Sequence, residues 1–137
     1  MLGEHEDRAS QAGTRGQQGV ELAALLELID STEGRDRRRL ALDLIRKGQS
    51  TEGGWGPFAQ SPPQAFDTAL ALLALDRHRD QDGVLAMIKK GRAYLASIQQ
   101  DDGSWTETTR PSGNESYAQR LSTTGWAAMA LLTVKTP

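Results

Sequence analysis

"QQDDGSW", residues 99–105, resembles an earlier stretch of the same chain, "QSTEGGW", residues 49–55. In both, six positions separate a Gln from a Trp, and a Gly lies two places before the Trp. Both follow an apolar helical run and lead, through a loop that bears Pro and Gly, into another apolar run. This shared context predicts an internal repeat of about fifty residues, and the loops absorb its differences in length.

The segments around these stretches predict two kinds of helix and almost no strand. Amphipathic segments with Lys and Arg on one face, typical of outer helices, are residues 36–47 and 84–98. Segments that are apolar almost all round, typical of buried inner helices, are residues 20–29, 65–75 and 123–134. The chain is therefore predicted to be all-α, with inner and outer helices in alternation.

The composition bounds the size and the partners of the protein. A chain of 137 residues is long enough for one core, and we expect a disordered leader at 1–19 followed by one repeat domain at 20–137. The formal net charge of -2 gives no global field for nucleic acid, and no apolar run reaches the length of a membrane span. Cysteine is absent, which excludes disulfides and thiolate chemistry. We predict a soluble protein with a cytoplasmic location.

The repeated residues suit a structural link between helices. A Gln at the end of an outer helix can satisfy backbone groups that lack intrahelical partners. Gly53 and Gly103 permit a positive φ in the turn, so that the indole of Trp55 or Trp105 can return over the Gln amide and bury a large apolar area.

At this point the residues resemble a known family. "KKGRAYLASIQQDDGSW" is similar to the QW motif of squalene-hopene and oxidosqualene cyclases, and the segment that continues to Leu132 also resembles a cyclase segment. The repeat around Trp55 is a weaker match, and together the two cover about residues 20–134. The motif positions are filled by Lys90, Gly91, Tyr94, Leu95, Gln99, Gly103 and Trp105.

The resemblance implies an α/α toroid, a fold shared with protein prenyltransferase β subunits. A closed barrel of this kind needs many more helices than the chain holds, so we expect an incomplete arc of about five helices. It also implies that the QW motifs act as clamps between outer helices, here formed by Gln49, Gly53, Trp55, Gln99, Gly103 and Trp105.

The family's acid motif is incomplete here. Class II terpene cyclases donate a proton from the middle Asp of an Asp-x-Asp-Asp-Thr-Ala segment, and the corresponding stretch reads "QAFDTA", residues 64–69. Phe66 stands where the proton donor would be, and phenylalanine cannot donate a proton. Asp67 is the candidate catalytic remnant, with a favourable charge at a helix start as the alternative. We therefore do not expect the chain to be catalytically competent alone.

The remaining candidates concern ligands and metals. Phe66, Trp126 and Tyr117 are predicted to bind an apolar ligand. Asp80 and Asp82 lie in a charged segment typical of a solvated turn, and neither histidine has partners at zinc-ligand spacing. We predict neither a metal nor a cofactor.

These features leave three functional hypotheses open. The first is a fragment or partial copy of an isoprenoid cyclase that binds a hydrophobic isoprenoid or acts as a scaffold. The second is a non-catalytic interaction module that completes a toroid with another subunit, and the third and weaker one is a glycan-active α/α toroid. The expected partners are an isoprenoid, a further copy or subunit covering exposed inner helices, and a peripheral membrane surface, but no nucleic acid.

Overall fold

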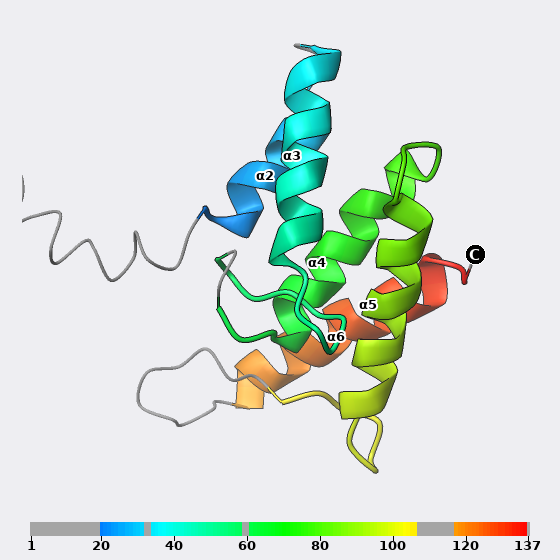
Figure 1. Ribbon diagram of the computed structural model, residues 1–137. Helices are drawn as coiled ribbons and strands as arrows, with labels where there is room; N and C mark the ends of the chain where they lie inside the picture. The colour runs from blue at the N-terminus through cyan, green and yellow to red at the C-terminus, as the bar shows by residue number, and fades with distance from the viewer. Residues whose placement is uncertain (1–19, 32–33, 59–60, 107–116, 137) are drawn as a thin grey trace, which may run out of the picture.

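The structure is a computed structural model that describes residues 20–31, 34–58, 61–106 and 117–136, with residues 117–121 described by their backbone alone (Figure 1). The described residues form five α-helices and one short 3-10 helix: α2 (Leu22–Ile29), α3 (Arg35–Gly48), α4 (Ala65–Leu75), η1 (Asp76–His78), α5 (Val84–Ile98) and α6 (Tyr117–Thr133). Over these ranges there is no strand, although Glu21 and Phe58 form an isolated bridge. The predicted all-α fold is confirmed, as an arc of helices without a closed barrel in the part described.

The helix boundaries agree with the sequence prediction within two residues, except at the start of α6. Helices α4 and α5 have the predicted bounds, while α2 begins two residues later and α3 is one residue longer at each end. Helix α6 begins at Tyr117, before the predicted start of the third inner helix at residue 123. Thr68 is the fourth residue of α4, whereas Thr124 is the eighth residue of α6. Part of the difference in length between the two repeats therefore lengthens a helix instead of a loop.

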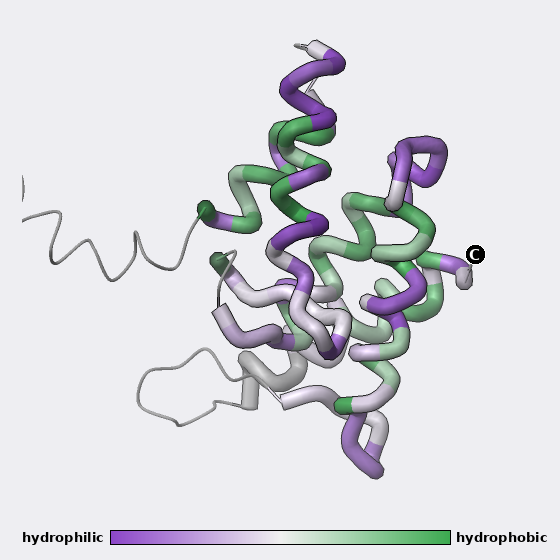
Figure 2. Tube along the Cα trace, in the orientation of Figure 1, coloured by the Kyte–Doolittle hydropathy of each residue, from purple (hydrophilic) through white to green (hydrophobic). Residues whose placement is uncertain are grey.

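Helix α4 lies at the centre of the packing and contacts α2, α5 and α6 (Figure 1). Eight of its eleven residues are buried, and the three that are not, Phe66, Leu70 and Leu73, follow one another at helical spacing along one stripe. Figure 2 shows that this helix is mostly hydrophobic. The sequence "AFDTALALLAL" is thus apolar on every side because almost every side has a neighbour.

Helices α3 and α5 are amphipathic, and most of their charged side chains are exposed. The buried face of α3 consists of Ala41, Leu42 and Ile45, while arginines on its other face are exposed. Figure 2 shows this alternation of hydrophilic and hydrophobic residues along α3. Helix α5 is tied to the end of α6, because the guanidinium of Arg92 donates to the backbone oxygens of Leu131, at 2.8 Å, and of Val134.

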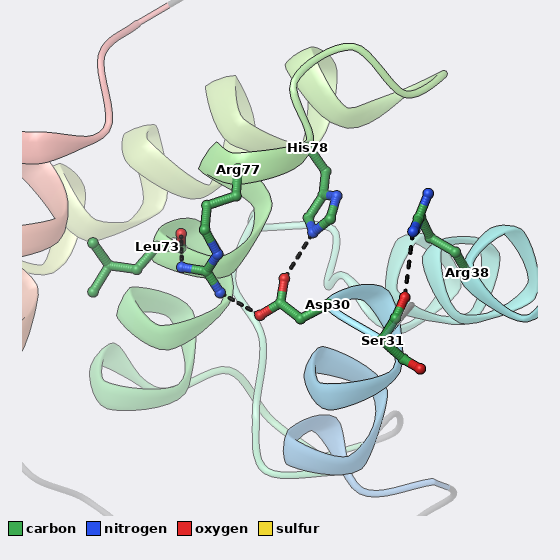
Figure 3. Close-up of polar contacts among 6 residues, drawn as sticks. All are labelled: Asp30, Ser31, Arg38, Leu73, Arg77 and His78. Atoms are coloured by element: carbon green, nitrogen blue, oxygen red, sulfur yellow. Dashed lines mark hydrogen bonds and ion pairs between the residues drawn. The ribbon is translucent and has the colours of Figure 1, made fainter. Parts of the chain in front are cut away.

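A polar cluster holds the end of α2 to the residues after α4 (Figure 3). One carboxylate oxygen of Asp30 accepts from Arg77 at 2.5 Å, and the other lies 2.8 Å from Nε2 of His78. Burial alone would raise the pKa of Asp30, but the hydrogen bonds and charges of Arg77 and His78 outweigh it and hold that pKa below its usual value.

Candidate functional site

The first Gln-Gly-Trp turn, residues 49–55 and called the first turn below, joins two outer helices through side-chain hydrogen bonds. The amide nitrogen of Gln49, at the end of α3, donates to the backbone oxygen of Gly53 at 2.8 Å and to that of Met87 in α5 at 3.0 Å. The indole nitrogen of Trp55 donates to the backbone oxygen of Ile45 at 2.8 Å. The carbonyl of Ile45 lies in the last turn of α3, where helix oxygens lack intrahelical partners.

The second turn, residues 99–105, repeats this arrangement fifty residues later. The amide nitrogen of Gln99 donates to the backbone oxygen of Gly103 at 2.9 Å, and the indole nitrogen of Trp105 donates to that of Leu95 at 2.9 Å. Both indoles are buried, with Trp55 2% and Trp105 1% exposed. Within the described ranges, however, Gln99 is exposed and makes no bond equivalent to the one between Gln49 and Met87.

The glycines of the two turns differ in their surroundings although their backbones are alike. Gly53 has a φ of 105° and Gly103 a φ of 89°, values that favour glycine. A Cβ atom on Gly53 would lie 2.3 Å from the backbone oxygen of Lys90 in α5. A Cβ atom on Gly103 would approach the amide of Gln99 at 3.8 Å, which is an ordinary contact. The first turn is therefore packed tightly on α5.

Two threonines that the sequence analysis did not assign to the turns bind the backbone of the tryptophans. The hydroxyl oxygen of Thr68 accepts from the Trp55 backbone nitrogen at 2.9 Å and donates to its oxygen at 3.2 Å. Thr124 makes the same pair of bonds to Trp105, at 2.9 and 3.4 Å. The sequence could have indicated this role, because a Thr stands at the start of the segment that the second and third predicted inner helices share.

Two of the three predicted ligand residues lie together on the inner helices. The ring of Phe66 on α4 meets the ring of Trp126 on α6 edge to face, with centroids 6.3 Å apart and an interplanar angle of 89°. Trp126 is 38% exposed, and the apolar residues that follow it on α6, Met129 and Leu132, are 48% and 77% exposed. Tyr117 is the first residue of α6, and its side chain lies outside what the structure describes. We call Phe66, Trp126, Met129 and Leu132 the inner apolar face.

Asp67, the candidate acid, lies in the first turn of α4 and is 9% exposed. It follows Phe66 in the helix, so its side chain projects about 100° away from that ring around the helix axis. A carboxylate in the first helical turn is also favoured by the positive end of the helix dipole. The position suits either a charge at a helix start or a remnant acid.

Neither a metal centre nor a membrane helix is found in the part of the chain that the structure describes. No group of three or more His, Cys, Asp or Glu side chains there could hold a metal ion. No helix there is long and apolar enough to cross a membrane. An open groove between α3 and the segment 80–82 has a mixed charged lining that includes Asp36, Arg39 and Arg46 and contains none of the predicted site residues.

Comparisons with known proteins identify the family. The family model described as the squalene-hopene cyclase C-terminal domain matches residues 17–136. The lanosterol synthase of Saccharomyces cerevisiae is 32% identical over 110 residues, which cover 77% of this chain and 15% of the yeast enzyme. No solved structure matches the chain at a significant level. With its two Gln-Gly-Trp turns and its alternating helices, the chain belongs to the squalene-hopene cyclase C-terminal domain family.

Proposed function

We propose that this chain is a cyclase-type repeat domain that binds a hydrophobic isoprenoid on the inner apolar face and does not itself supply the proton for cyclisation. The observation that carries the proposal is the pair of Phe66 and Trp126, which join two inner helices through an edge-to-face contact. Met129 and Leu132, which follow Trp126 on α6, are also exposed. Exposed apolar patches of this kind mark ligand or partner sites more often than ordinary surface.

The chemistry of an isoprenoid fits these side chains. A branched polyene has no strong hydrogen-bonding groups along its chain, so its binding depends on burying apolar area, at roughly 25 cal/mol for each Å². Aromatic rings supply large and rigid apolar surfaces, and the thioether of Met129 adapts to irregular shapes. The mixed charges of the groove beside α3 do not offer this environment.

The absence of proton donation is inferred from "QAFDTA", residues 64–69. Phe66 has no ionisable group, and Asp67 lies in the first turn of α4, a position that suits a charge at a helix start. Protonation of an alkene needs a strong acid, and the position of the family's proton donor is occupied by Phe66. The proposal therefore predicts no cyclised product when the chain is incubated with squalene. Product that disappears in Asp67→Asn would show that Asp67 is an acid after all.

The yeast lanosterol synthase is much longer than this chain, which covers 15% of its length. We infer that the chain corresponds to part of a cyclase architecture and that further repeats complete the inner apolar face. Those repeats come either from the same polypeptide or from another subunit. Reading the coding sequence on both sides of the region distinguishes these two arrangements.

Ligand binding is tested by native mass spectrometry and thermal shift with farnesol, farnesyl diphosphate and squalene, with hexadecane as a linear apolar control. We expect a branched isoprenoid to form a complex and raise the melting temperature. Trp126→Ser should weaken this binding about tenfold or more, because a buried aromatic contact contributes about 1.5–3 kcal/mol. Leu85→Ser, which changes an exposed leucine on α5, is the matched control.

The outcomes separate the ligand hypothesis from the scaffold hypothesis. Binding that is lost in the Trp126 variant and kept in the Leu85 variant supports the proposal. Equal binding of hexadecane and isoprenoids would reduce the site to a non-specific apolar surface. If no isoprenoid binds at any concentration tested, the ligand hypothesis is wrong and the domain is a scaffold.

A further inference from the structure

The two methionines in the described part of the chain lie in opposite surroundings. Met87 on α5 is 2% exposed, and its backbone oxygen accepts from Gln49 of the first turn. Met129 on α6 is 48% exposed and belongs to the inner apolar face. A thioether becomes a sulfoxide only where an oxidant reaches the sulfur, so exposure decides which methionine reacts. Met129 is therefore the accessible one of the two.

Met129 lies in the middle of the apolar stripe on α6. It follows Trp126 by three residues and precedes Leu132 by three, so the three side chains share one side of the helix. Trp126 in turn meets the ring of Phe66 on α4 edge to face. A chemical change at Met129 therefore alters the surface between the aromatic pair and Leu132, which is the surface that the proposed ligand would cover.

The neighbouring inner helix carries a different residue at the matching position. Met129 is the fifth residue after Thr124, and Leu73 on α4 is the fifth residue after Thr68. Leucine and methionine have similar volumes and exchange for one another at small cost in packed sites. The hydrocarbon side chain of Leu73 resists a peroxide, whereas the sulfur of Met129 offers it a lone pair. The two inner helices therefore present similar apolar shapes and differ in their response to an oxidant.

We propose that Met129 is a reversible oxidation site and that its sulfoxide weakens isoprenoid binding on the inner apolar face. This inference rests on the proposed function, because it concerns the regulation of the same face. The oxidant is hydrogen peroxide. A lone pair of the Met129 sulfur attacks one peroxide oxygen, so the S–O bond forms as the O–O bond breaks, and the proton of the transferred oxygen passes to the departing hydroxide to give water. Sulfur loses two electrons and the peroxide gains them.

The sulfoxide acts on ligand binding more than on the fold. Its oxygen is a polar acceptor on a side chain that was apolar. In the free chain Met129 is exposed, so water satisfies this oxygen and the helices keep their packing. A polyene bound on the face displaces that water and has no donor to replace it, so the affinity should fall about tenfold or more. Methionine sulfoxide reductase restores the thioether: two thiol groups become a disulfide, and the oxygen leaves as water.

The test begins with the full chain and hydrogen peroxide, with and without saturating farnesol. The chain has no cysteine, so no thiol competes for the oxidant. Peptide mass spectrometry with fragmentation reports which methionine gains an oxygen, and we expect Met129 to react at least about tenfold faster than Met87 in the folded chain. Farnesol should slow the oxidation of Met129. The oxidised chain should keep its melting temperature without ligand and bind farnesol about tenfold or more weakly, until the reductase and dithiothreitol restore binding.

Two variants assign the effect to one sulfur. Met129→Leu gives α6 the residue that α4 carries, and its affinity for farnesol should be the same before and after peroxide. Met87→Leu is the matched control, because it keeps Met129 and should still lose affinity on oxidation. Melting curves verify that each variant is folded.

The outcomes separate this inference from the proposed function. An unoxidised chain that binds no isoprenoid would overturn both. Binding that survives complete oxidation of Met129 would overturn the inference alone. So would equal oxidation rates of Met87 and Met129 in the folded chain, or a loss of binding on oxidation that persists in Met129→Leu.

Discussion

Replacing one glycine in each turn by alanine should destabilise the two turns to very different extents. Gly53→Ala and Gly103→Ala both place a Cβ atom on a backbone with positive φ, which costs about 1–2 kcal/mol at either position. At Gly53 the added atom would also lie 2.3 Å from the oxygen and 2.9 Å from the carbon of the Lys90 carbonyl. Backbone atoms cannot rotate away as a side chain does, so the first turn and α5 must separate.

The extra cost at Gly53 follows from what that separation disrupts. Forcing atoms into a packed contact costs about 1–3 kcal/mol, and losing the bond between Gln49 and Met87 costs about 1 kcal/mol more. We therefore expect Gly53→Ala to lower the free energy of unfolding by about 2–4 kcal/mol more than Gly103→Ala does. At about 4 °C for each kcal/mol, the two melting temperatures should differ by about 8 °C or more.

The measurement is urea unfolding and thermal melting followed by far-ultraviolet circular dichroism. Both variants are compared with the wild type at a protein concentration low enough to keep all three monomeric, so that contacts between copies do not contribute. Equal destabilisation by the two alanines, or a larger effect at Gly103, would show that the first turn is not packed against α5 as described.

Three further predictions test other contacts. Gln49→Leu should lower the free energy of unfolding, measured with urea, by about 2 kcal/mol, because it removes two hydrogen bonds. Gln99→Leu removes one hydrogen bond and should lower it by about 1 kcal/mol or less. Equal losses in the two variants would contradict the bridging role of Gln49. Thr68→Val keeps the shape of the side chain but removes both hydrogen bonds to the Trp55 backbone, so it should lower the free energy of unfolding by about 1–3 kcal/mol. A melting temperature equal to that of the wild type would refute this expectation. The pKa of Asp30 is lower in the folded state than in the unfolded state. The carboxylate therefore stabilises the fold at pH values above its unfolded pKa near 3.8, and this stabilisation is lost as the pH falls through the folded-state pKa. Asp30→Asn should therefore lower the free energy of unfolding at pH 7 by less than about 1 kcal/mol, since the Asp30 side chain is 40% exposed. A loss of stability at pH 2 that equals or exceeds the loss at pH 7 would contradict this pH dependence.

Much of the fold could be predicted because its signals are local. The apolar run of α4 and the amphipathic pattern of α5 define both helices to the residue, since the periodicity of side chains reflects which faces are buried. The glycines of the two turns have the positive φ that their place before a returning Trp requires. Helix α6 was predicted too short, because an inserted segment can continue a helix or form a loop with little difference in composition.

The contacts of the site could be predicted less well, because they depend on how distant segments meet. Thr68 and Thr124 occupy matching positions in the two repeats, but their bonds to the tryptophan backbones follow from the placement of α4 and α6. The cluster of Asp30 with Arg77 and His78 joins residues almost fifty positions apart that share no motif (Figure 3). The roles assigned to Asp67, Phe66 and Trp126 in chemistry or binding remain predictions.

The tryptophans of the two turns are structural, whereas we assign the tryptophan on α6 to the ligand face, and this division is the central claim. The indole N–H groups of Trp55 and Trp105 are buried and donate to helix carbonyls, while the ring of Trp126 is 38% exposed. The most direct test is a nitrogen-15 NMR spectrum of the three indole groups, recorded during hydrogen exchange and again during titration with farnesol. We expect two indole signals that exchange slowly and do not shift, and a third, from Trp126, that exchanges quickly and shifts as ligand is added. A shift of the Trp55 or Trp105 signal in place of that of Trp126, or exchange of either at the rate of Trp126, would contradict the claim.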